Sequence, residues 1–194
     1  MKRKYLPNNV YIRDMNAIKL PFEFEPDIMK KELAQFSDKD YQDIYNPSVE
    51  LETLWLKHFI EPKNGPDGLP VFQPNDALKK CPYLLSIFEM FQCNVETFRV
   101  HTLDPGASIQ KHRDTGYSFE LGQVRLHIPV QTNDKVEILV EDKPIPMKAG
   151  ECWYCNFNIE HEVRNNSDQP RVHLILDCIV NDWLTHVFKL AENS

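Results

Sequence analysis

The sequence predicts a mainly β fold with flanking helices: a double-stranded β-helix (a cupin-like jelly roll) with N-terminal helices packed on one sheet. Two observations support this. From Asn94 onward the hydrophobic period is two, in short runs separated by turn-forming residues. Before that point, two segments carry apolar residues at helical spacing. The alternating runs are 95–102, 123–131, 135–140, 150–155, 159–164 and 170–180.

The first half of the chain is mixed. The segment 16–24 alternates weakly and predicts a strand, and Pro26 stands where a helix can begin. Segment 82–92 carries a helical apolar stripe and predicts a second helix. Segment 51–60 fits a strand or a short helix, and the choice stays open. Segment 61–76 is rich in Pro, Gly and Asn and predicts an exposed loop.

The length of 194 residues fits one domain. A closing helix is expected over 181–190, capped by Asn181 or Asp182. The expected organisation is a single domain, 1–194, with a mixed helical and strand support half at 1–93, a jelly-roll catalytic core at 94–180, and a C-terminal helix and tail at 181–194.

Composition excludes several classes of partner. The net charge is −7, so we expect neither nucleic acid nor an anionic membrane surface as the main partner. The sequence has no apolar run of about eighteen residues, the length that spans a bilayer, and no apolar segment of the secretory type follows its basic start. Five cysteines without framework spacing favour free thiols and a cytoplasmic location.

Polar side chains gather on one face of the predicted strands. In one run Arg125 and His127 share a face, and in another Arg171 and His173 do the same, while aliphatic residues take the opposite faces. If the polar face lines the barrel interior, the aliphatic face needs cover. The two apolar-striped helices of the first half can provide that cover.

A metal site is predicted by His112, Asp114 and the more distant His161. The first two are two residues apart, so on an extended segment their side chains project to the same side. Two histidines and one carboxylate on one side of Fe(II) leave open coordination positions for a keto acid and O₂. A histidine two residues before an aspartate also arises by chance in surface turns, so the prediction depends on the whole set.

Arg171 stands ten residues after His161 and completes the pattern. 2-Oxoglutarate chelates iron through its keto oxygen and C1 carboxylate, and its C5 carboxylate needs a fixed partner. A guanidinium fork gives that carboxylate two parallel, charge-assisted bonds. Arg125 and His127 would bind further oxygens of the keto acid. The alternative for Arg171 is an ion pair with an acidic residue on a sheet surface.

Four segments together resemble the aspartyl/asparaginyl β-hydroxylase family of Fe(II)/2-oxoglutarate dioxygenases, to which bacterial proline hydroxylases are related. They are DPGASIQKHRDT, VRLHIPV, KAGECWYCN and HEVRNNSDQPRVHLILD, between Phe98 and Asp177. The resemblance implies that the two histidines and Asp114 bind iron. It also implies that Arg171 holds the C5 carboxylate of 2-oxoglutarate, with help from Arg125 and His127.

The expected function is hydroxylation of an amino acid, either free or as an Asp-, Asn- or Pro-type residue in a peptide. The cofactors would be Fe(II), 2-oxoglutarate as co-substrate and O₂, with release of succinate and CO₂. Two alternatives remain: a non-catalytic jelly-roll protein that binds a metal or small ligand, and a cupin-type enzyme without a keto acid. The sequence leaves substrate identity and oligomeric state open.

Five side chains are candidate substrate contacts: Arg99, Arg113, Tyr117, Trp153 and Asn156. Arg113 lies between two ligands and should point away from the metal if the segment is extended. Core packing is the alternative for Trp153, and a turn is the alternative for Asn156.

Cys152 and Cys155 have the spacing of a redox or zinc motif. They lack the following helix of a redox motif and the second cysteine pair of a zinc site. We therefore expect both to pack within a strand. His101, His173 and His186 are expected to be structural, with a supporting role beside Arg171 open to His173.

Overall fold

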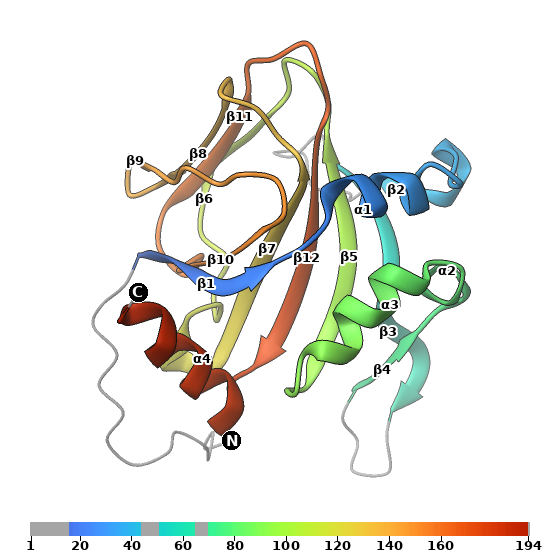
Figure 1. The fold of residues 1–194 in the computed structure, drawn as a ribbon, viewed down its shortest axis with the longest axis horizontal. Helices are drawn as coiled ribbons and strands as arrows, with labels where there is room; N and C mark the ends of the chain where they lie inside the picture. Colours follow the sequence, from blue (N-terminus) through green and yellow to red (C-terminus); the bar gives the residue numbers. More distant parts are fainter. Residues whose placement is uncertain (1–15, 44–50, 65–69, 194) are drawn as a thin grey trace.

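The computed structural model describes residues 16–43, 51–64 and 70–193. They form two antiparallel sheets with helices on one side (Figure 1). The eight-stranded sheet has the order β1-β10-β7-β12-β5-β3-β2, with β4 paired to β3, and the four-stranded sheet has the order β6-β11-β8-β9. This architecture confirms the predicted jelly-roll class.

The larger sheet comprises β1 (Ala17–Glu23), β2 (Gln42–Asp43), β3 (Glu52–Asn64), β4 (Pro70–Pro74), β5 (Val95–Leu103), β7 (Gln123–Gln131), β10 (Glu151–Cys155) and β12 (Arg171–Ile179). The smaller sheet comprises β6 (Ser108–His112), β8 (Val136–Val140), β9 (Lys143–Pro144) and β11 (His161–Asn165). The helices are α1 (Pro26–Leu33), α2 (Asp76–Lys79), α3 (Pro82–Met90) and α4 (Asp182–Glu192), and 3₁₀ turns occupy Asp38–Asp40 and Phe119–Leu121.

The helices cover the aliphatic face of the larger sheet, as the alternation predicts (Figure 1). Leu126 on β7 and Leu174 on β12 are fully buried in the same core as Met29 of α1, Leu84 of α3 and Phe188 of α4. Burying this face provides the main hydrophobic stabilisation of the fold. The opposite face of the same strands is thereby left to carry polar side chains.

Side-chain oxygens hold the N-terminal ends of α3 and α4. Pro26 opens α1, as expected. The Glu32 carboxylate accepts hydrogen bonds from the backbone N–H groups of Tyr83 (2.7 Å) and Leu84 (3.0 Å), which lie at the start of α3. The cap of α4 is Asn181, whose side chain accepts from the Leu184 N–H at 2.9 Å.

Two expectations from the first half need revision. The undecided segment 51–60 is strand, as part of β3. The loop expected over 61–76 is wrong in part, because β3 continues to Asn64 and β4 pairs with it. Both prolines of β4 stand at the ends of a short strand that pairs on one side only, where a missing N–H is tolerated. Residues 65–69 of this segment lie outside the described residues.

All five cysteines are free. Cys152 is buried in the core under the helices, and Cys155 is buried in a second core near the smaller sheet. Burial raises the pKa of both thiols above the ordinary value. This confirms strand packing for the pair. Within the described residues, no helix has the length and apolar character needed to cross a membrane.

Gly150 lets two parts of the fold approach closely, since it has a positive φ of +86°. A Cβ at this position would lie 2.4 Å from the backbone oxygen of Phe24, whose N–H donates to the Gly150 carbonyl at 2.8 Å. Gly106 also has a positive φ, +76°, but a Cβ there would meet nothing within 4 Å. A side chain at Gly106 would therefore strain the backbone only, whereas a side chain at Gly150 would strain the backbone and also clash with Phe24.

We expect Gly106→Ala to cost roughly 1 kcal/mol, from strain alone. Gly150→Ala should cost roughly 3 kcal/mol, because strain and overpacking add there. Urea unfolding followed by circular dichroism measures both. Equal losses in the two variants would contradict the close packing of Gly150 against Phe24.

Candidate active site

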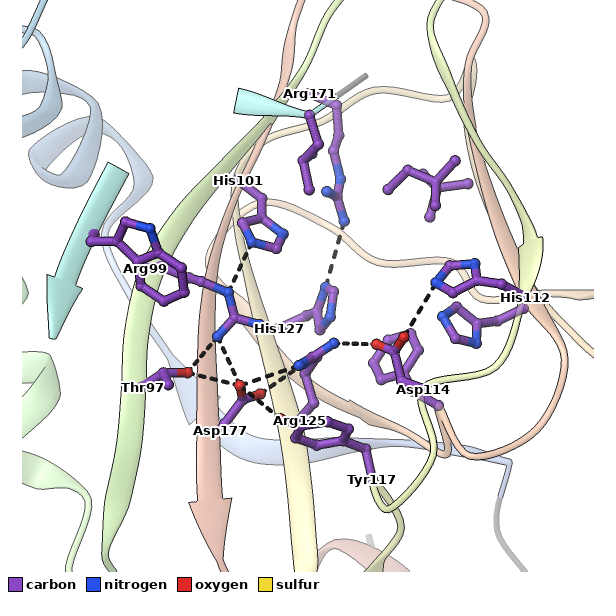
Figure 2. A pocket seen from close by; sticks show the side chains of 16 residues that line it. Thr97, Arg99, His101, His112, Asp114, Tyr117, Arg125, His127, Arg171 and Asp177 are labelled. Atoms are coloured by element: carbon purple, nitrogen blue, oxygen red, sulfur yellow. Dashed lines mark hydrogen bonds and ion pairs between the residues drawn. The ribbon is translucent and has the colours of Figure 1, made fainter. Parts of the chain in front are cut away.

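The three predicted metal ligands come together at one side of a cavity between the two sheets (Figure 2). His112 ends β6 and His161 begins β11, and the two are direct partners in the antiparallel pairing of these strands. Asp114 follows two residues after β6. One potential ligand atom from each residue lies within 4.8 Å of the others, and His112 Nε2 is 3.3 Å from Asp114 Oδ1.

Both histidines are oriented by backbone carbonyls. His112 Nδ1 lies 2.7 Å from the Gln110 oxygen, and His161 Nδ1 lies 3.0 Å from the Ile159 oxygen. A carbonyl only accepts, so each Nδ1 carries a proton, and each Nε2 is the ring atom left to bind a metal. Asp114, which faces His112 Nε2, raises the pKa of His112 in the absence of a metal. Burial lowers the pKa of His161. The neutral, ligating form of that imidazole is therefore favoured.

Asp114 is positioned by a loop and not by a strand. Its backbone N–H donates to the Phe157 carbonyl at 2.8 Å, and its own carbonyl accepts from the Tyr117 N–H at 3.2 Å. On the side chain, Oδ1 faces His112, and Oδ2 accepts a hydrogen bond from Arg125 Nη1. The expected convergence with His112 occurs, although β6 ends before Asp114.

This donor set fits a ferrous ion. Two imidazole nitrogens and one carboxylate oxygen form the ligand combination of Fe(II) sites with open positions, and no thiolate is among the donors. The three groups line a cavity of about 410 Å³, so the open side of a bound ion would face that space. A small organic ligand fits a cavity of this size.

Arg171 lies on the same cavity and is only 1% exposed (Figure 2). Within the described residues it has no carboxylate partner. Its Nη2 lies 2.8 Å from His173 Nδ1 and 3.5 Å from His127 Nδ1, and its Nε has no hydrogen-bond partner in the described structure. Burial accordingly lowers the pKa of this guanidinium. A buried cation without a counter-ion is costly, and an anionic ligand would remove that cost.

Arg125 differs from Arg171 because carboxylates already surround it. Its Nε donates to Asp177 Oδ1 at 2.7 Å and its Nη2 to Asp177 Oδ2 at 3.2 Å. Its Nη1 donates to Asp114. His127, also predicted to bind the co-substrate, lines the cavity and keeps its Nε2 without a hydrogen-bond partner in the described structure.

The predicted substrate contacts divide into two groups. Arg99 and Tyr117 line the cavity. Arg99 is 4% exposed; its Nε donates to His101 Nε2 at 2.8 Å, and its Nη1 pairs with Asp177 Oδ2 at 2.8 Å. Tyr117 lies under Arg125, whose Cζ is 4.0 Å from the ring centroid.

The structure does not bring the other three candidates to the cavity. Arg113 points to the surface and pairs with Glu160 at 3.5 Å, as expected of a residue between two ligands. The Trp153 indole N–H donates to Glu151 at 2.8 Å, and its ring packs on the second core. Asn156 accepts from the Asn158 N–H at 3.2 Å in a turn. The alternatives of core packing and a turn therefore describe Trp153 and Asn156.

Sequence reasoning missed several residues that shape the site, among them Asp177 and Phe157. Asp177 shares the polar face of β12 with Arg171 and His173, so the alternation already contained a signal for it. Phe157 lies between two histidine rings, with centroids 4.8 Å from His127 and 4.6 Å from His161. No pattern in the sequence indicates that contact, because Phe157 stands in a turn after β10.

Comparisons with known proteins show the family of the chain. The fold is a jelly roll, its His-Asp-His cluster could hold a metal ion, and a family model described as aspartyl/asparaginyl beta-hydroxylase matches residues 25–180. The chain belongs to this family. It is 32% identical over 103 residues to a protein named L-proline cis-4-hydroxylase from Rhizobium meliloti (strain 1021). That match covers 51% of this chain and 36% of the relative.

Solved structures confirm the fold class. An oxidoreductase of the 2OG-Fe(II) oxygenase family from Burkholderia pseudomallei aligns with a TM-score of 0.58 at 11% identity, over 86% of each chain. A prolyl-4-hydroxylase from Pseudomonas putida aligns with a TM-score of 0.50 at 14% identity, over 87% of this chain and 95% of that one. At such identities the likeness extends to the fold alone.

Three buried histidines make stability depend on pH. Burial, reinforced by nearby arginines, holds the pKa of His101, His127 and His173 well below the ordinary value. In the unfolded chain these side chains take up protons below about pH 6.5. Because the folded protein resists that uptake, its free energy of unfolding falls as the pH drops through this value.

We therefore expect stability to fall between about pH 7.5 and pH 5.5, by up to roughly 1.4 kcal/mol per pH unit for each such histidine. His173→Asn should reduce the slope by one histidine's share, since the amide oxygen can still accept from Arg171. Urea unfolding across this range measures the slope. Above about pH 8 the two proteins should show the same slope, and an identical slope below pH 6.5 would contradict a neutral, buried His173.

Proposed function

We propose that this chain is an Fe(II)- and 2-oxoglutarate-dependent dioxygenase that hydroxylates a small amino acid and releases succinate and CO₂. The observation that carries the proposal is the pairing, on one cavity, of the His112–Asp114–His161 cluster with a buried Arg171 that has no carboxylate partner in the described structure. A metal site alone fits many functions. A buried arginine that needs an anionic partner beside that metal site fits a keto diacid, which has one end to bind the metal and a second carboxylate for the arginine.

Each residue of the set has a distinct proposed role. His112 Nε2, Asp114 Oδ1 and His161 Nε2 would hold the iron, whose bound form would couple O₂ reduction to oxidation of 2-oxoglutarate. Arg171 would bind the C5 carboxylate through its two-pronged guanidinium. Its neighbours His127 and His173 are neutral and therefore leave the positive charge of Arg171 uncompensated until the carboxylate binds.

The far wall of the cavity would bind the substrate. Arg99 and Tyr117 line it, together with Trp55, whose ring lies 5.5 Å from Arg99 Cζ. The charge of Arg99 is already met by Asp177, so the aromatic rings of Trp55 and Tyr117 would provide the main contacts, which suit the aliphatic side chain of an amino acid. The cavity volume of about 410 Å³ has to hold the co-substrate as well, which favours a free amino acid over a peptide. The proline hydroxylase relative makes cyclic amino acids the first candidates.

A screen of free amino acids tests the reaction. The purified chain, supplied with Fe(II), 2-oxoglutarate and ascorbate, should release succinate with the right amino acid. Mass spectrometry should find the matching product with one added oxygen atom. Binding of metal and keto acid without succinate or product from any amino acid or peptide would favour the non-catalytic alternative.

Arg171→Ala tests the co-substrate site. We expect affinity for 2-oxoglutarate to fall by about 2–5 kcal/mol, the usual cost of truncating one partner of a buried charge pair. The affinity for Mn(II), used in place of Fe(II), should stay unchanged, because Arg171 contacts none of the proposed metal-binding residues in the structure. Arg164→Ala is the matched control, since Arg164 is a surface arginine of β11 paired with Glu162. Equal keto-acid affinity in both variants would assign Arg171 a structural role.

A further inference from the structure

A chain of side chains connects the middle of the larger sheet to the proposed metal site (Figure 2). Asp177 lies on β12, directly opposite Arg125 of β7 and Thr97 of β5 in the strand register. It is 2% exposed. Its Oδ2 accepts from Thr97 Oγ1 at 2.7 Å and from Arg99 Nη1 at 2.8 Å. The carboxylate is thus fixed in place from the far side of the cavity.

Arg125 connects Asp177 to the proposed metal ligand Asp114. Two nitrogens of Arg125, Nε and Nη2, donate to the two oxygens of Asp177, and the third nitrogen, Nη1, donates to Asp114. The ring of Tyr117 covers one face of the guanidinium at 4.0 Å. Bonds at all three nitrogens and a ring on one face leave the guanidinium a single orientation.

We propose that Asp177, acting through Arg125, is a positioning residue for the metal carboxylate Asp114. With Oδ2 of Asp114 occupied by Arg125, its other oxygen, Oδ1, is turned towards His112 Nε2 at 3.3 Å and is available to a metal. This matters because Asp114 stands in a loop beyond β6, so the strand itself does not fix its side chain. The inference rests on the metal site proposed above.

The inference changes the role expected for Arg125. The family resemblance implies that Arg125 helps to hold 2-oxoglutarate. In the structure its N–H groups already donate to Asp114 and Asp177, whereas Arg171 lines the cavity with an Nε that has no hydrogen-bond partner in the described structure. Loss of Arg125 or Asp177 should therefore weaken metal binding, while loss of Arg171 should weaken keto-acid binding.

Mn(II) binding to the purified 194-residue chain, measured by electron paramagnetic resonance without 2-oxoglutarate, tests this division. We expect Asp177→Asn to weaken Mn(II) affinity by about 10- to 100-fold, the range found when partners of metal ligands are removed. Arg125→Lys should act in the same direction, because one ammonium cannot bond both carboxylates in the same geometry. The visible spectrum of bound Co(II) should change in both variants, which a purely structural role would not require.

Two comparisons separate the possible failures. Arg171→Lys should keep the wild-type Mn(II) affinity and lose 2-oxoglutarate affinity. His112→Ala should lose Mn(II) binding; if it does not, the metal site itself is wrong. If His112→Ala loses the metal while Asp177→Asn and Arg125→Lys bind it as wild type does, only the positioning role is overturned. Should Asp177→Asn fail to fold by circular dichroism, Arg125→Lys alone decides.

Discussion

The site depends on the contact between the Asp177 carboxylate and the guanidinium groups of Arg99 and Arg125. Charges placed between two sheets lose their hydration, and only close, oppositely charged partners compensate for that loss. Burial would raise the pKa of Asp177, but Arg99 and Arg125 together hold it well below its usual range. The two arginines are in turn neutralised by Asp177 and Asp114. Arg171, in contrast, has no carboxylate partner among the described residues.

One strand joins the two ends of the site. β12 places Arg171, His173 and Asp177 on the cavity side, while Leu174 and Leu176 enter the core under the helices. This division follows from the two-residue period of an extended strand. β12 is also paired on both sides, with β5 and β7, so its register fixes Arg171 and Asp177 relative to each other. The smaller sheet supplies the histidines from the opposite side of the cavity.

The sequence was most informative where residues act through local periodicity. It predicted the polar faces of β7 and β12 and the helical cover in this way, whereas the convergence of His112 with His161 was expected from the whole set of motif residues. It missed β6, whose exposed polar residues hide a strand at the edge of the smaller sheet. It also could not predict the partner of Arg125. That partner is set by the register between β7 and β12, which are far apart in the chain, and no local pattern encodes such a pairing.

Arg125 and Arg171 show why the counter-ion decides the role of a buried arginine. In the sequence both stand on the polar face of a β-strand beside a histidine two residues on, and nothing local distinguishes them. In the structure Arg125 is paired with two carboxylates, whereas the hydrogen-bonding neighbours of Arg171 among the described residues are neutral imidazoles. A guanidinium with its own carboxylates can orient a neighbour but has little to offer a ligand. One without them is stable in the interior chiefly when an anion arrives, which makes ligand binding and charge compensation the same event.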